Sequence, residues 1–287
     1  MGVVTRGTMG RKVWRFKGAS GMMAFLAIIG LAWASAQPQT FQLHYTPSDF
    51  RLDVPMDLTL DAPAFRHEPD YASKKIVRGY LPLGAEKEGF VGFAIDSKGR
   101  TLYLDLNRNL DLTDDADGRH TCADSFFSTF EAVRVTRPGK TGPIPYVLDV
   151  MQYPDGGVHL TVRSGWRGQI ELGGKRGSFS IVDNLNGVID ADDQFLLNLM
   201  KDGDSADWDQ PIPAARTLML DGQLFDLSYR FEGTGLEVTF SEAARPTGSV
   251  SLEGEGTDRL ILSGEESPST VVINSPGKEV WVPAGTY

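Results

Sequence analysis

Residues 217–240, TLMLDGQLFDLSYRFEGTGLEVTF, contain three apolar runs that are separated by short turns. Asp221 and Gly222 lie between the first two runs, and an Asp-Gly pair in this setting is a strong signal for a two-residue β-hairpin turn. The runs are rich in alternating, aromatic or β-branched residues, which favour strands. We therefore expect consecutive strands joined by tight turns in this part of the chain.

The same pattern extends along most of the sequence. Turns such as Asp155-Gly156-Gly157 and Lys98-Gly99 separate many further short runs of this kind. Many short strands with regular turns predict an all-β fold with a sandwich or barrel-like main domain. Further strands are expected at 41–45, 76–83, 90–95, 101–106, 132–135, 146–151, 158–162, 170–172, 178–182, 249–252, 260–262, 270–273 and 280–282.

Helical periodicity is scarce, so we expect at most one or two short helices. The clearest case is 192–201, where Asp192 fits an N-cap. The apolar face of this expected helix consists of Phe195, Leu196, Leu199 and Met200. A second short helix is expected at 124–131.

Residues 1–36 have the features of a secretory signal peptide. Basic residues at positions 11, 12, 15 and 17 precede an apolar run at 22–33, and Ala34-Ser35-Ala36 matches the small-x-small cleavage pattern. A membrane anchor is the alternative, but this run falls short of the roughly 20 residues that a helix needs to span a bilayer. We expect cleavage after Ala36 and a secreted or periplasmic protein with no membrane span in its mature form, with Met1 or Met9 as the start.

The chain of 287 residues is acidic, with a formal net charge of −10. Five basic residues and no acidic residue precede Gln37, so the mature chain carries a charge of −15. This acidity argues against a nucleic-acid partner, which needs clustered Lys and Arg to neutralise phosphates. Cys122 is the sole cysteine, which excludes an intrachain disulfide framework and a Cys-rich zinc site.

A domain boundary is expected at 242–247, where Ala-Ala-Arg-Pro-Thr interrupts the strands. It separates an all-β domain, 37–241, from a small β segment, 242–287. The runs GSVSL at 248–252 and VPAGTY at 282–287 resemble the start of a carboxypeptidase-regulatory-like sandwich. This resemblance implies a small β-sandwich-like segment that is incomplete as such a domain. Those modules normally continue further, so the end is either a natural edge strand or that of a truncated product.

Residues 105–115, DLNRNLDLTDD, form the first of two acidic loops. Calcium prefers six to eight oxygen ligands at about 2.3–2.6 Å, and alternating oxygen side chains in a tight loop can face one centre. We therefore expect a Ca²⁺ site here. Its candidate ligands are Asp105, Asn107, Asn109 and Asp111, with Asp114 or Asp115 completing the shell.

Residues 183–193, DNLNGVIDADD, form a second loop after a second expected strand. With one inserted residue, this loop aligns with the first. Carboxylates packed this closely repel one another unless a cation relieves the repulsion, so a second Ca²⁺ site is expected. The matched pairs are Asp105 with Asp183, Asn107 with Asn186, Asp111 with Asp190, and Asp114 with Asp193.

Asp105, Asn107 and Asn109 resemble the calcium loops of EF-hand and dockerin proteins. The sequence departs from them at Leu110, where those loops have glycine, and at Ala116, where they have a bidentate acid. A strand, rather than an EF-hand helix, precedes the loop. The two loops together resemble those of uncharacterised secreted bacterial proteins in which a strand leads into Asp-x-Asn-x-Asn-x-Asp-Leu-Thr-Asp, a resemblance that implies no activity.

Other interpretations remain open. Asp and Asn are also ordinary turn formers, and an acidic turn is often only a solvated turn. His120 and Cys122 are close enough in sequence for a nucleophilic pair, although a lone cysteine is more often a small core residue. Trp166 and Trp208 either stack on sugar rings or, more commonly for tryptophan, pack in the core.

We therefore predict an exported binding or scaffold module rather than an enzyme, with one or two structural calcium loops. Its expected partner is a carbohydrate or a cell-surface protein. The alternative is a secreted, glycosidase-like hydrolase that uses the same carboxylates.

Overall fold

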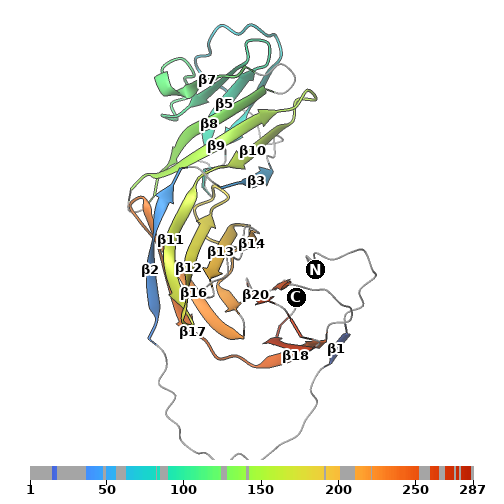
Figure 1. Ribbon diagram of the computed structural model, residues 1–287. Coiled ribbons are helices and arrows are strands. Elements are labelled where there is room, and N and C mark those ends of the chain that lie inside the picture. Colours follow the sequence, from blue (N-terminus) through green and yellow to red (C-terminus); the bar gives the residue numbers. More distant parts are fainter. Residues whose placement is uncertain are drawn as a thin grey trace, which may run out of the picture.

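The computed structural model is nearly all β, as predicted (Figure 1). Its described residues contain no α-helix, and one 3-10 turn, η2 (Ala116–Gly118). No helix in this part of the chain is long and apolar enough to cross a membrane. The structure describes residues 15–17, 37–47, 50–55, 63–81, 83–84, 90–123, 128–139, 142–190, 192–200, 211–220, 222–251, 259–264, 269–274, 276–277 and 279–285.

The largest sheet has ten strands and curves into a nearly closed barrel (Figure 1). All its neighbours are antiparallel except β15 and β20, which pair in parallel. Leu220 pairs with Gln223 around the predicted Asp-Gly turn, which confirms the hairpin. In spatial order the strands are β14 (Ile212–Pro213), β13 (Gln194–Met200), β12 (Lys175–Val182), β11 (Gly165–Leu172), β2 (Gln39–Thr46), β17 (Gly235–Glu242), β16 (Gln223–Glu232), β15 (Thr217–Leu220), β20 (Ser269–Asn274) and β19 (Arg259–Ser263).

Two four-stranded antiparallel sheets lie beyond one end of the curved sheet (Figure 1). The first consists of β3 (Leu52–Pro55), β10 (Val158–Val162), β9 (Ile144–Gln152) and β8 (Ser128–Arg137). The second consists of β4 (Ile76–Leu81), β5 (Val91–Asp96), β6 (Thr101–Asp105) and β7 (Arg119–Thr121).

The segment after residue 242 is divided between two sheets. Its strands β19 and β20 extend the ten-stranded sheet, whereas β18 (Thr247–Ser251) pairs with β21 (Glu279–Pro283) and with β1 (Arg15–Lys17). A small apolar cluster unites the two groups, and it includes Met219 from β15. The segment therefore shares both a sheet and a core with the preceding strands. Since β1 precedes Gln37, the predicted cleavage would leave β18 paired with β21 alone.

Both expected helices are wrong where the structure describes them. Residues 194–200 form β13, which pairs with β12 over seven residues. Phe195 and Leu197 are buried and Leu196 is less so, which is the alternation of a strand. Residues 128–131 begin β8, and 124–127 lie outside the described residues.

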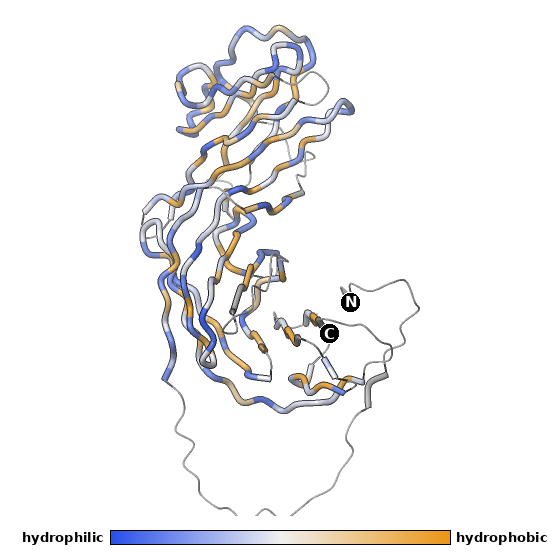
Figure 2. Tube along the Cα trace, viewed as in Figure 1, coloured by the Kyte–Doolittle hydropathy of each residue, from blue (hydrophilic) through white to orange (hydrophobic). Residues whose placement is uncertain are grey.

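The main core contains buried residues from the curved sheet and from both four-stranded sheets. Buried and partly buried residues alternate along strands such as β17, where Leu236, Val238 and Phe240 are buried. Figure 2 shows hydrophobic and hydrophilic residues interspersed along the strands. Trp166 lies among aromatic side chains, with edge-to-face contacts to Tyr146 and Phe231. The end of β12, from which the acidic loop at 183–193 begins, belongs to this core.

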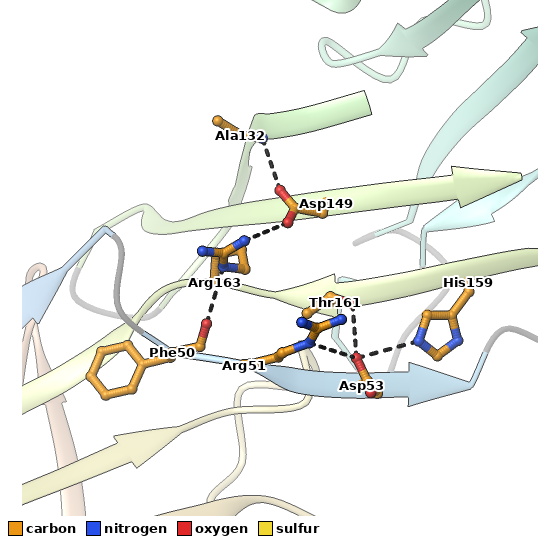
Figure 3. Close-up of polar contacts among 8 residues, drawn as sticks. All are labelled: Phe50, Arg51, Asp53, Ala132, Asp149, His159, Thr161 and Arg163. Carbon is orange, nitrogen blue, oxygen red and sulfur yellow. Dashed lines mark hydrogen bonds and ion pairs between the residues drawn. The ribbon is translucent and has the colours of Figure 1, made fainter. Parts of the chain in front are cut away.

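A polar network attaches the start of β3 to β9 and β10 (Figure 3). Arg163 donates to the Asp149 carboxylate (2.6 Å) and to the Phe50 carbonyl (3.1 Å). Asp149 also accepts a hydrogen bond from the Ala132 N–H (3.0 Å), at the irregularity of β8 between Phe130 and Val133. One ion pair therefore connects three segments of chain.

Candidate functional site: two carboxylate-closed loops

Loop 1, residues 105–115, and loop 2, residues 183–193, each connect two paired antiparallel strands. Loop 1 leaves β6 and returns through η2 to β7, with Leu102 opposite His120. Loop 2 leaves β12 and returns as β13, with Val182 opposite Gln194. The two predicted loops are therefore equivalent hairpin corners in different sheets.

Asp105 is the buried anchor of loop 1, with 2% of its surface exposed. One carboxylate oxygen accepts the Asn109 N–H (3.0 Å), and the other accepts the Leu110 N–H (3.0 Å). A single carboxylate therefore holds the chain in a tight turn around itself.

Asn107, Asn109 and Asp111 form three successive Asx turns. The Oδ1 atom of each accepts the N–H two residues further on, at 3.0, 2.8 and 2.8 Å. Asp111 also accepts the hydroxyl of Thr113 (2.5 Å), and these bonds lower the pKa of Asp111. The alternation in the sequence thus becomes a continuous series of side-chain-to-backbone bonds.

Asp114 and Asp115 close loop 1 from its C-terminal end. Asp114 accepts hydrogen bonds from the side-chain amides of Asn107 (3.2 Å) and Asn109 (2.6 Å). Asp115 accepts the N–H of Leu106 (2.8 Å). The structure therefore brings all the predicted loop 1 residues into one hydrogen-bonded network.

Leu110 occupies the position at which EF-hand loops have glycine, and it adopts the left-handed conformation with a φ of 66°. This conformation costs a non-glycine residue about 1–2 kcal/mol. The hydrogen bond from the Leu110 N–H to Asp105 helps to offset that cost. A non-glycine residue therefore holds the left-handed conformation at this position of the loop.

Backbone from an earlier segment binds loop 1 directly. The N–H of Arg66 donates to the Leu110 carbonyl (2.7 Å), and the N–H of Leu112 donates to the His67 carbonyl (3.1 Å). The conformation of loop 1 is therefore linked to that of the chain around residues 66 and 67.

Asp183 anchors loop 2 and is fully buried. Its two oxygens accept the Gly187 N–H at 3.1 and 3.0 Å, and the Tyr146 hydroxyl donates to Oδ2. Asx turns follow at Asn184, Asn186 and Asp190, with N–H···O distances of 3.1, 2.7 and 3.0 Å.

Asp193 closes loop 2 and is 1% exposed. It accepts the N–H of Asn184 (2.7 Å) and of Asp190 (2.7 Å). The Asn186 amide donates to the Asp190 carboxylate (3.2 Å). All four predicted loop 2 residues therefore belong to one network as well.

The closing carboxylates correct the predicted alignment of the two loops. Asp115 bonds the N–H that follows Asp105, and Asp193 bonds the N–H that follows Asp183. Asp193 therefore corresponds to Asp115 and not to Asp114. Both loops span the same number of residues between their first and last acids, so no net insertion separates them.

Burial disfavours ionised carboxylates in both loops. Burial raises the pKa of Asp105, and the negative charge of Asp115 raises it further. Burial also raises the pKa of Asp183 and of Asp193, and the charge of Asp183 adds to the effect on Asp193. The loops differ in their nearby charges, because the positive charge of Arg137 opposes the shift of Asp183.

Each loop borders a pocket. The pocket beside loop 1 has a volume of about 380 Å³, and Asp70, Tyr103, Asp115 and Arg119 are among its lining residues. The pocket beside loop 2 has a volume of about 420 Å³, and its lining residues include Asp53, Asn184, Asn186 and Asp192. Each pocket thus combines carboxylates with other polar groups.

Trp166 packs in the core and does not form a sugar-stacking surface. It is 1% exposed, and its indole N–H donates to the Thr234 carbonyl (2.9 Å). Trp208 lies outside the described residues. The structure instead places Trp281 of β21 on the surface, where it is 59% exposed. The sequence signal for this exposure was the alternation of Trp281 with Val280 and Val282, both of which are buried.

The predicted nucleophilic pair is His120 and Cys122. Nε2 of His120 is buried and has no hydrogen-bond partner among the described residues. Cys122 packs against the main core, as expected of a small core residue. Asp53 accepts the Thr161 hydroxyl (2.8 Å) and lies 3.3 Å from Nε2 of His159 (Figure 3). Both contacts end on the Asp53 carboxylate. His159 therefore does not bridge the Thr161 hydroxyl and the Asp53 carboxylate, as the histidine of a catalytic triad would.

Among the residues that the structure describes, no three His, Cys, Asp or Glu side chains form a cluster suited to a metal ion. Loop 1 mixes carboxylates with Asn side chains, so an ion there would need amide oxygens as ligands too.

Comparisons with protein families, with curated proteins and with solved structures find no significant match to this chain.

Proposed function

We propose that loop 1 binds one calcium ion, which stabilises the corner between β6 and β7 in an exported binding or scaffold protein. The observation that carries the proposal is the single network formed by the six Asp and Asn side chains of loop 1, anchored on a buried carboxylate. The ion would serve the fold rather than a reaction.

The chemistry of the ligands supports calcium. Loop 1 has six side chains that carry oxygen, and calcium prefers six to eight oxygen ligands. Carboxylate and amide oxygens each have two lone pairs, so an oxygen that accepts one N–H can still bind an ion. The Asx turns hold these oxygens in place, which reduces the entropy lost on binding.

The electrostatics of loop 1 also favour a cation. Asp105 is buried beside a second carboxylate, Asp115, which makes its ionised form costly. A divalent ion would offset that cost and the repulsion from Asp111 and Asp114. Calcium at Asp183, Asn186, Asp190 and Asp193 stays a prediction with less support, because the positive charge of Arg137 already acts on Asp183.

Thermal melts in chelator, calcium and magnesium test the proposal. The folded chain should melt at a higher temperature in calcium, because a ligand specific for the folded state stabilises that state by about 2.7 kcal/mol at 100 times its Kd. Asp105→Ala should abolish the calcium effect. Asp155→Ala is the matched control, since Asp155 also accepts an N–H two residues on (2.9 Å) but lies in an exposed turn elsewhere.

Trp281 is the structural feature that best fits a carbohydrate or cell-surface partner. Its ring is exposed on a strand whose neighbouring positions face the core. Aromatic rings on flat surfaces contribute large contact areas at little entropic cost. Trp281→Ala should weaken capture of the partner on a glycan array or on intact cells and leave the melting temperature in place.

Export itself has a direct test. Expression with the full leader should yield a mature chain that begins at Gln37, as determined by mass spectrometry of the extracellular or periplasmic fraction. A chain that keeps residues 1–36 in the cytosol would contradict the proposal.

The alternative is a hydrolase that uses carboxylates beside loop 1. Asp70 and Asp115 line the same pocket, as a two-carboxylate mechanism requires. This alternative predicts glycosidase activity that persists in chelator and is lost in Asp70→Asn. The calcium proposal predicts that Asp70→Asn leaves calcium binding intact.

A further inference from the structure

Arg137, at the end of β8, extends into a narrow space between two glycines. A Cβ atom on Gly84 would lie 2.9 Å from Nε of Arg137, and a Cβ atom on Gly187 would lie 1.2 Å from Nη1. The stem of the arginine therefore passes one glycine, and its guanidinium rests directly on the backbone of loop 2. Any side chain at position 187 would have to displace it.

The guanidinium also lies near Asp183, the buried anchor of loop 2. Gly187, on which it rests, donates its N–H to both oxygens of Asp183. Tyr146 donates its hydroxyl to the same carboxylate, and the positive charge of Arg137 lowers the pKa of Asp183 and of Tyr146 against the larger effect of burial. Arg137 is therefore a cation that lies against loop 2 at Gly187, close enough for its charge to act on the anchor Asp183.

The charged side chains around loop 1 are arranged differently from those around loop 2. There Arg108 donates to two carbonyls, those of Leu106 (3.3 Å) and Thr136 (2.8 Å). The charged group that acts on Asp105 is Asp115, another carboxylate. The two loops thus share a carboxylate-closed backbone, but the charged side chain that acts on the anchoring acid is a carboxylate in loop 1 and a guanidinium in loop 2.

We infer that Arg137 is a built-in cation of loop 2, which takes the place of a metal ion and keeps loop 2 from binding one. Arg137 is in this sense a positioning and specificity-determining residue: it neutralises Asp183 and fills the space above Gly187. The inference does not depend on calcium binding at loop 1.

Counting bound calcium ions in the intact chain tests the inference. Arg137→Gln removes the charge, so this variant should melt at a lower temperature in chelator and should bind one more calcium ion than the unmodified chain. Added calcium should restore part of the lost melting temperature. Asp183→Asn in the Arg137→Gln background should remove the extra ion, and Arg137→Lys, which keeps a positive charge, should not gain it.

The expected increment is one ion whether or not loop 1 binds calcium, so the two proposals fail separately. Equal ion counts for Arg137→Gln and the unmodified chain would overturn the inference. If Arg137→Gln does not fold, Asp105→Ala decides: the inference predicts no bound calcium in that variant. One remaining ion that Asp183→Asn removes would show that loop 2 binds metal with Arg137 in place.

Discussion

At the scale of single residues, each loop contains a residue in the left-handed conformation that its neighbours stabilise. Leu110 adopts a left-handed conformation beside the carboxylate of Asp105, and Gly187 adopts one beneath the guanidinium of Arg137. In each case a buried acid accepts the N–H of the left-handed residue. The anchoring aspartates therefore determine the local backbone.

Gly187→Ala should be strongly destabilising. Its φ of 70° costs an alanine about 1 kcal/mol, and the displaced guanidinium adds about 1–3 kcal/mol of overpacking. Gly174→Ala is the matched control, because Gly174 has a φ of 74° with no atom within 4 Å of the added Cβ. Urea denaturation should show a larger loss for Gly187→Ala; equal losses would mean that Arg137 does not occupy that space.

Tyr146→Phe should lower the free energy of unfolding by about 1–3 kcal/mol, because it removes a donor from the buried Asp183 carboxylate. The ring stays available to pack on Trp166, so the core contact is retained. An unchanged denaturation midpoint would indicate that water or Arg137 fully replaces the hydroxyl.

At the scale of elements, Arg66 and His67 connect a distant segment to loop 1, and Glu68 fixes that segment to β4. Arg78 donates to Glu68 at 2.5 and 3.2 Å, and these bonds lower the pKa of Glu68. The stability from a lowered carboxyl pKa is present above the unfolded-state pKa of about 4.3 and is lost as the pH falls through the folded-state pKa.

Glu68→Gln should therefore reduce stability at pH 7 by about 1 kcal/mol and should have a smaller effect near pH 3. The check is the urea midpoint of both chains at the two pH values. Equal losses at pH 7 and pH 3 would show that the ionised carboxylate makes no contribution.

Asp149→Ala should cost about 1–3 kcal/mol, because Arg163 and the Ala132 N–H would both lose their acceptor. Glu171→Ala provides the comparison, since its ion pair with Arg176 is largely exposed and should be worth less than about 0.5 kcal/mol. Thermal melts measure both. If Asp149→Ala loses no more stability than Glu171→Ala, the polar network does not hold β3 in place.

The strands were predictable where apolar residues alternate between Gly, Asp and Asn turns, as in β15, β16 and β17. The expected helix at 192–201 failed because Phe195, Leu196 and Leu197 are consecutive apolar residues that fit either period, and pairing with β12 decided in favour of a strand. The loop residues were predictable because Asx turns depend on local sequence. Arg137 was not, because it reaches loop 2 from a strand far away in sequence.

At the scale of the whole molecule, several of the acidic side chains lie in the two hairpin corners. Each corner anchors a buried aspartate at a strand end and closes the loop with a second acid. The charged side chain that acts on the anchor is an arginine, Arg137, in one corner and a carboxylate, Asp115, in the other. This difference is why we assign calcium to loop 1 and the guanidinium to loop 2.

Calorimetric titration of the mature chain with calcium, after removal of bound ions with a chelator, tests this assignment most directly. The account predicts binding of one ion per chain, accompanied by a higher melting temperature, with both effects lost in Asp105→Ala. No heat of binding together with an unchanged melting temperature would contradict it.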